Sequence, residues 1–163
     1  MTILPKSKLG AILVLVFIYI ATISLSIFFF KFITLKFELK GLNAFFSADI
    51  FATLLLWLIG VVVGNPCVFD LQWSIIPPVF LFSFYLYNGR VNKLEIEDIW
   101  FIGTVLFWAV RLTFNCLVNW GGFDHIDWRI INFKNKGALA WFFINLTSIH
   151  LIPTLITFTS MLP

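Results

Sequence analysis

Three polar side chains recur at four-residue intervals in an otherwise apolar stretch of the chain: Arg111, Asn115 and Asn119. On a helix this spacing places them on one face, as a stripe that drifts slowly around the axis. A charged residue near the middle of a bilayer costs about 2.5–3.5 kcal/mol even on the insertion scale, and marks a functional site by default. The stripe therefore predicts a helix face that turns toward protein, water or a ligand rather than lipid.

The residues alone favour a structural role for this stripe. Arg111 would pair with a carboxylate, such as Asp49 or Asp127, and tie helices together. The two asparagines would then act as interhelical hydrogen-bonding groups, worth about 0.6 kcal/mol each on average. Arg111 can also extend toward the membrane interface, because its predicted span ends eight residues further on.

Other side chains that could do chemistry are isolated. His150 has no carboxylate within two helical turns, which favours a neutral core histidine over a proton relay. Cys67 and Cys116 have neither a CxxC partner nor metal-ligand spacing, so we expect no metal site. The chain contains no GxGxxG, P-loop, HExxH or GxSxG motif. We therefore expect no catalytic residue in this chain alone.

The composition sets the surroundings of these side chains. The 163 residues are 61% hydrophobic and 12% charged, whereas a soluble domain carries about 25% charged residues. The eleven Lys and Arg residues form no basic stripe, so the net charge of +3 does not indicate nucleic-acid binding. We expect an integral membrane protein whose partners are membrane lipids and other integral membrane subunits.

Five apolar stretches approach the roughly 20 residues that a helix needs to cross a hydrocarbon core. They are residues 9–30, 44–64, 71–87, 98–119 and 137–163. The first is longer than a secretory signal's apolar region and no cleavage site follows it, so we expect it to remain as a span. The predicted fold is all-α: a single transmembrane domain over residues 1–163, built as a polytopic helix bundle of about five spans. The flanking Lys and Arg residues divide five against five, so topology stays open.

Local signals refine three of these spans. Ser47 or Asp49 is expected to cap the second helix. Pro77 and Pro78 fit the first turn of the third, where backbone amides have no intrahelical partner. Pro153 is expected to kink the fifth.

Two linked motifs give the chain a family resemblance. The first is VFDLQWSIIPP at residues 68–78, and the second is RLTFNCLVNWGGFDHIDWR at residues 111–129. Together they resemble the steroid 5-alpha-reductase-like membrane family, in its branch of uncharacterised multi-span proteins, over roughly residues 45–160.

The resemblance implies a fold of seven spans in which NADPH is held near the membrane face and a lipid-like enone is reduced by hydride transfer. A guanidinium group suits the phosphates of such a cofactor, which would explain an arginine within a span. If the family site persists, the cofactor-binding residues are Arg111, Asn115, Asn119, Asp127, Trp128 and Arg129.

The chain also departs from the family pattern. Val118, Ile126 and Ile130 stand where the family commonly has a basic residue, Glu and Tyr. The sequence ends after the fifth predicted span, so we expect a bundle truncated relative to the seven-span fold, without the C-terminal cofactor motif. The expected function is a non-catalytic structural subunit of a membrane protein complex, with no cofactor for this chain alone. Two alternatives stay open: part of an NADPH-dependent membrane reductase, as a fragment or a split enzyme, and a lipid-binding membrane protein.

Overall fold

The computed structural model describes residues 4–162, which contain helices and no strand. Five helical segments in this range are long and apolar enough to cross a membrane, which confirms the predicted all-α bundle of about five spans. They are α1 (Lys8–Lys36), α2 (Gly41–Val63), η1 with α3 (Pro66–Phe69 and Gln72–Tyr87), α4 (Ile96–Asn119), and α6, η3 and α7 (Ala138–Phe143, Ile144–Leu151 and Ile152–Ser160). Two short helices, η2 (Val91–Lys93) and α5 (Trp128–Lys134), lie in the connections before and after α4.

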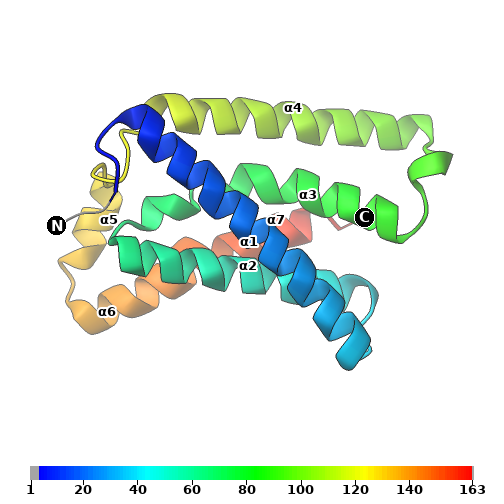
Figure 1. Cartoon of the computed structure of the whole chain (residues 1–163), viewed down its shortest axis with the longest axis horizontal. Coiled ribbons are helices and arrows are strands. Elements are labelled where there is room, and N and C mark those ends of the chain that lie inside the picture. Colours follow the sequence, from blue (N-terminus) through cyan, green and yellow to red (C-terminus); the bar gives the residue numbers. More distant parts are fainter. Residues whose placement is uncertain (1–3, 163) are drawn as a thin grey trace.

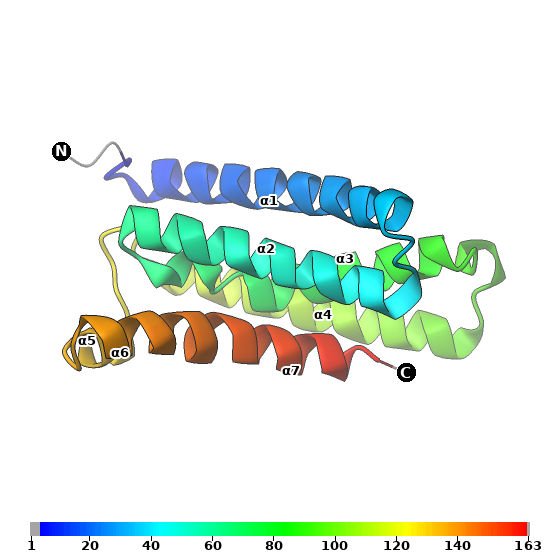
Figure 2. The ribbon, with the colours of Figure 1, turned by 90° about the horizontal axis from the view of Figure 1, so that it is seen from below.

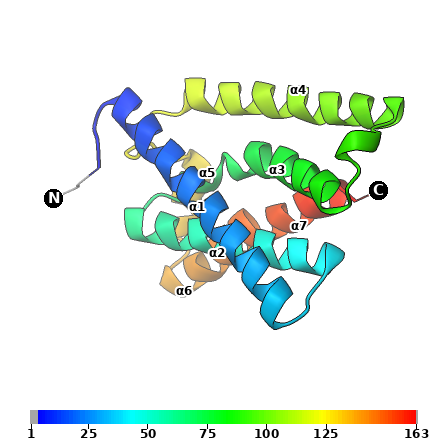
Figure 3. The same ribbon diagram turned by 45° about the vertical axis from the view of Figure 1, so that its right-hand side comes forward.

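Helix α2 occupies the centre of the bundle. It packs against α1, η1 and the last span, while α3 lies between α7 and α4. The long helices run side by side along the length of the molecule, and α1 crosses α2 obliquely (Figures 1 and 2). Helix α4 lies along one edge, apart from α2 and α7, and this separation persists when the molecule is turned (Figure 3). It buries only two side chains, Val105 and Ala109.

Helix α2 begins and ends differently from the prediction. It starts at Gly41, so Ser47 and Asp49 lie inside the helix and do not cap it. The Ser47 hydroxyl instead donates to the backbone carbonyl of Asn43 at 2.8 Å, and Asp49 is buried. The helix ends at Val63 and is capped by Gly64, whose φ of 77° is a left-handed conformation that glycine adopts without strain.

The prolines also occupy positions other than those predicted. Helix α3 begins at Gln72, so Pro77 and Pro78 lie in its second turn and not in its first. Each removes one backbone hydrogen bond, yet the helix continues to Tyr87. In the last span the α-helical geometry stops at Phe143 and resumes at Ile152, with a π-helix between them and Pro153 at the start of α7. The span thus contains a π-helix immediately before Pro153, where a kink was expected, and this local geometry is frequent at functional sites.

The core lies at the end of the bundle where α1 starts and α2 ends. Its buried side chains include Leu15, Tyr19, Leu56, Val68, Phe69, Trp120 and Phe123. The Tyr19 hydroxyl donates to the Val68 carbonyl at 2.9 Å and so fixes η1 against α1. The Asn65 amide donates to the carbonyls of Phe123 and His125 at 2.7 and 2.8 Å, which attaches the loop after α4 to the same core.

Candidate functional site

The predicted stripe lies on α4, and all three of its side chains are exposed. The Asn119 amide donates to the backbone carbonyl of Asn115 at 2.8 Å and to its side-chain oxygen at 3.0 Å. Arg111, one helical turn before Asn115, forms neither a hydrogen bond nor an ion pair with any residue between 4 and 162. Arg111, Asn115 and Asn119 thus lie on one helix and are exposed within the described part of the chain, so what this face meets stays a prediction.

The pairing expected for Arg111 is not found. Asp49 accepts a hydrogen bond from Gln72, and Asp127 forms an ion pair with Arg129 at 2.8 Å. This is the one ion pair within the described residues. Asp49 is unavailable because it points into the bundle, whereas Asp127 is held by the side chain two residues further along its own helix.

Asp127 and Arg129 stabilise the start of α5. The Asp127 carboxylate accepts from the Arg129 backbone amide at 2.8 Å, which caps the helix, and from two nitrogens of the guanidinium at 3.0 and 2.8 Å. The guanidinium beside it lowers the pKa of Asp127 to about 2 and is the main cause of that shift. The same bonds raise the pKa of Arg129. Trp128 between them is 69% exposed, as an aromatic residue of a membrane interface would be.

Four of the six residues of the predicted cofactor site form two separate pairs. Asn115 and Asn119 are hydrogen-bonded near the end of α4, and Asp127 and Arg129 near the start of α5. Arg111 and Trp128 contact neither pair through a hydrogen bond. The stripe and the start of α5 lie at the same end of the molecule, joined by the loop after α4 (Figure 1).

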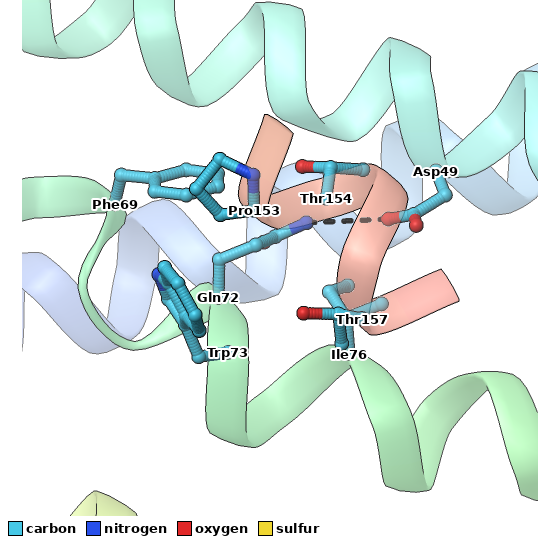
Figure 4. Close-up of a pocket in the computed structure, with 8 residues that line it drawn as sticks. All are labelled: Asp49, Phe69, Gln72, Trp73, Ile76, Pro153, Thr154 and Thr157. Atoms are coloured by element: carbon cyan, nitrogen blue, oxygen red, sulfur yellow. Dashed lines mark hydrogen bonds between the residues drawn. The ribbon is translucent and has the colours of Figure 1, made fainter. Parts of the chain in front are cut away.

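A second group of polar residues lies inside the bundle, and the sequence did not predict it. Asp49 on α2 is 7% exposed and Gln72 on α3 is 3% exposed. The Gln72 amide nitrogen donates to an Asp49 carboxylate oxygen at 3.4 Å, as Figure 4 shows. The amide oxygen of Gln72 is buried and has no hydrogen-bond partner within the described residues. Buried polar atoms are nearly always paired, so this one requires an explanation.

Further hydroxyl and imidazole groups join α2 to the last span. The hydroxyls of Thr53 and Thr154 lie 2.7 Å apart, and Thr154 donates to the backbone carbonyl of His150 at 2.9 Å. His150 is fully buried, its Nδ1 lies 2.7 Å from the Asn145 carbonyl, and its ring packs on Phe69 at a centroid distance of 4.4 Å. His150 is therefore a buried core residue with one ring nitrogen hydrogen-bonded, whereas its Nε2 is buried without a hydrogen-bond partner among the described residues.

Asp49 is part of the lining of two cavities. On one side, between α2, α3 and α7, lies a space of about 10 Å³ lined by Asp49, Gln72 and Thr154 among others (Figure 4), room for a single water molecule. On the other side, between α1, α2 and α3, lies a cavity of about 410 Å³. Its walls are mainly aliphatic and aromatic, and Asp49 is the only acidic residue among those that line it.

The signal for this inner group was present but was interpreted differently. Asp49 lies inside a run of about twenty apolar residues, and an ionisable residue in such a run is a functional-site hypothesis by default. Placing the start of the helix three residues too late turned this carboxylate into a candidate cap. Gln72 could not be identified in the same way, because its role depends on how α3 is aligned with α2.

Comparisons with known proteins do not add to this description: neither a family model nor a curated protein nor a solved structure matches the chain. The similarity to the reductase-like family therefore stays a prediction from its two motifs. What the chain does has to follow from its own side chains. Two features are available for this: an arginine on the outside of the bundle and a carboxylate at the wall of an apolar cavity.

Proposed function

We propose that this chain is a multi-pass integral membrane protein with a structural role, a subunit that joins a membrane complex through α4. The observation that carries the proposal is the position of Arg111. Its side chain is exposed on the least buried of the five long helices, and no carboxylate among residues 4–162 pairs with it.

The depth of Arg111 makes a partner necessary. It lies eight residues before the end of α4, or about 12 Å along the helix axis. A guanidinium that faces lipid at this depth costs about 2.5–3.5 kcal/mol, and such groups in membrane proteins pair with carboxylates or backbone carbonyls. We expect the partner to be a transmembrane helix with a carboxylate at the depth of Arg111. Asn115 and Asn119 then offer further hydrogen-bonding groups along the same face.

The proposal is tested by purifying the tagged chain gently from its native membrane and identifying what co-purifies. We expect other membrane proteins to co-purify in fixed ratio. Their yield should fall about tenfold or more for Arg111→Leu, because the charge pair between Arg111 and the partner's carboxylate within the membrane is the main polar contact of the proposed interface. Arg90→Leu is the matched control, since Arg90 is also exposed but lies in the connection before η2. A chain that purifies alone, or an Arg111→Leu complex at full yield, contradicts the proposal.

The same preparation separates this role from that of a reductase. A split enzyme requires NADPH and a second chain that supplies further residues of the nucleotide site. If the nucleotide is retained together with such a chain, the stripe of Arg111, Asn115 and Asn119 belongs to a cofactor site and the structural proposal is wrong.

The cavity between α1, α2 and α3 favours lipid binding as a second function. Its volume of about 410 Å³ lies within the range of small-molecule pockets, about 300–1,000 Å³. We expect an acyl chain to fill it, and mass spectrometry of the intact protein to detect the bound lipid. Ala48→Phe places a ring in the cavity and should remove this lipid, whereas Ser24→Phe, on an exposed part of α1 outside the lining, should not. Equal lipid retention in both variants contradicts the assignment.

A further inference from the structure

We propose that the cavity between α1, α2 and α3 selects a single-chain amphiphile that carries an amine, with its ammonium group at Asp49. This inference rests on the lipid-binding role proposed above for the same cavity. It adds the chemical class of the ligand, which follows from the charges in the cavity wall.

The Asp49 carboxylate is uncompensated. It is 7% exposed, and its one side-chain partner among residues 4–162 is the uncharged amide of Gln72, at the long distance of 3.4 Å. No lysine, arginine or histidine between residues 4 and 162 forms an ion pair with it. A buried carboxylate is stabilised by a cationic donor, and an ammonium group offers three N–H bonds to it. A ligand amine would supply the positive charge that the protein does not.

The rest of the cavity wall is mainly aromatic and aliphatic. The rings of Phe30, Phe45 and Phe80 pack on one another with centroid distances of 4.8 and 5.4 Å, and they form a continuous aromatic surface along the cavity. Ile23 and Ile76 extend this surface with aliphatic groups. Such a wall accommodates a hydrocarbon chain, because the chain has no polar atoms that would need a hydrogen-bond partner. Ser26, Ser83 and Tyr87 are uncharged polar residues of the same lining, and Asp49 is its acidic residue, so we place the ammonium group at Asp49.

Lys31 is the other charged residue of the cavity lining, and it defines the main alternative. It is exposed and lies five residues before the end of α1, whereas Asp49 lies eight residues inside α2. A lysine near the end of a span extends toward the lipid head groups, which removes its charge from the cavity interior. An anionic ligand would bind at Lys31 and leave the Asp49 carboxylate unpaired, so we favour the amine.

Three ligands with the same chain distinguish these possibilities: dodecylamine, dodecanol and dodecanoate, each titrated into the full chain in lipid nanodiscs. We expect the amine to bind at least about tenfold more tightly than the other two, the difference that one charge-assisted hydrogen bond gives. Asp49→Asn should reduce amine affinity to that of the alcohol and leave alcohol binding unchanged. Asp49→Glu should retain the preference, which shows that charge and not folding is responsible.

The outcomes separate the two proposals for this cavity. Equal affinities for all three ligands, each abolished by Ala48→Phe, keep the lipid-binding role and overturn the selection of an amine. Tightest binding of dodecanoate, lost in Lys31→Gln, overturns it in favour of an anionic ligand. If no ligand binds the wild-type chain, both the lipid-binding role and the amine preference are wrong.

Discussion

The inner helices and α4 place their polar side chains in opposite directions. On α2, α3 and α7 the polar groups point inward, where Asp49 meets Gln72 and Thr53 meets Thr154. On α4 the stripe that begins at Arg111 points outward. In a protein surrounded by water, a charged side chain that points outward is solvated. In a bilayer the same side chain meets apolar lipid, so an outward-pointing charge is unfavourable there. The inner groups contact one another within the chain, whereas Arg111 has no hydrogen-bond or ion-pair partner among residues 4–162.

The same contrast separates two kinds of function. The inner group holds helices together and supplies one wall of a ligand cavity, so its effects should appear in stability and in ligand binding. The stripe on α4 contributes little to the fold, because α4 buries only Val105 and Ala109. Its effects should appear in association. Four predictions test this division, and they are ordered by the size of the expected effect.

The largest effect should come from the charge on α4. Arg111→Leu should make insertion of the segment 96–119 more favourable by about 3–4 kcal/mol, because arginine opposes insertion at the helix centre and leucine favours it. Insertion into microsomes, measured with glycosylation sites on either side of the segment, checks this value. Arg111→Lys should change little. A gain below about 1 kcal/mol would show that the guanidinium already reaches the interface, which would remove the need for a partner helix.

Truncating a buried side chain should have almost as large an effect on stability, and this effect should differ between the core and α4. Phe69 is 1% exposed and packs on His150, whereas Phe114 on α4 is 69% exposed. Phe69→Ala should lower the free energy of unfolding by about 3 kcal/mol, at the lower end for such truncations because lipid and not water surrounds the bundle. Phe114→Ala should change it by less than about 0.5 kcal/mol. Unfolding in mixed micelles measures both, and equal losses would show that α4 is packed against the bundle more tightly than its exposure indicates.

A smaller effect is expected from the hydroxyl pair inside the bundle. Thr53→Val and Thr154→Val should be coupled by about 0.6 kcal/mol, the average for hydrogen bonds between transmembrane helices. A double-mutant cycle of unfolding free energies measures this coupling. The control cycle combines Thr53→Val with Thr104→Val on exposed α4, and these two changes should be additive. Coupling of the same size in the control would mean that the two regions do not behave independently.

The smallest effect concerns the membrane surface. The folded pKa of Asp127 is about 2, below the value of about 3.9 in an unfolded chain. Its contribution to stability is therefore present above about pH 4 and is lost as the pH falls toward 2. Asp127→Asn keeps an acceptor for the cap but loses the ion pair, at a cost of about 0.3 kcal/mol, toward the low end for exposed pairs. The difference in thermal stability between wild type and Asp127→Asn should shrink from pH 6 to pH 3, and a constant difference would assign the effect to the cap alone.

The sequence predicts the number of long helices well because each needs a continuous apolar run. It predicts their ends less well, since α1 continues through Lys31 to Lys36 beyond the expected boundary at residue 30. Long lysine side chains can extend to the interface while the backbone stays helical, so a charge does not by itself end a span. Proline misleads in the same way: the pair in α3 was expected at its start, but tertiary packing holds the helix through it.

The candidate sites show a different limit of sequence analysis. The spacing of Arg111, Asn115 and Asn119 is a property of one helix, so their common face could be predicted. What a face points toward depends on how helices are packed, and this information is not contained in any single span. The contact of Asp49 with Gln72, 23 residues away, could not be anticipated for that reason, whereas the wrong capping role of Asp49 came from the predicted start of α2.

One contact has a consequence for how the protein is made. The ammonium group of Lys8 donates to the backbone carbonyl of Val118 at 2.6 Å, across 110 residues of chain. During synthesis α1 and α2 emerge early and can associate at once as neighbours in sequence, but the acceptor for Lys8 appears only when α4 is almost complete. Until α4 is made, the start of the first helix lacks this contact. The hydrogen bond between Lys8 and Val118 can therefore form only after the fourth span has been translated.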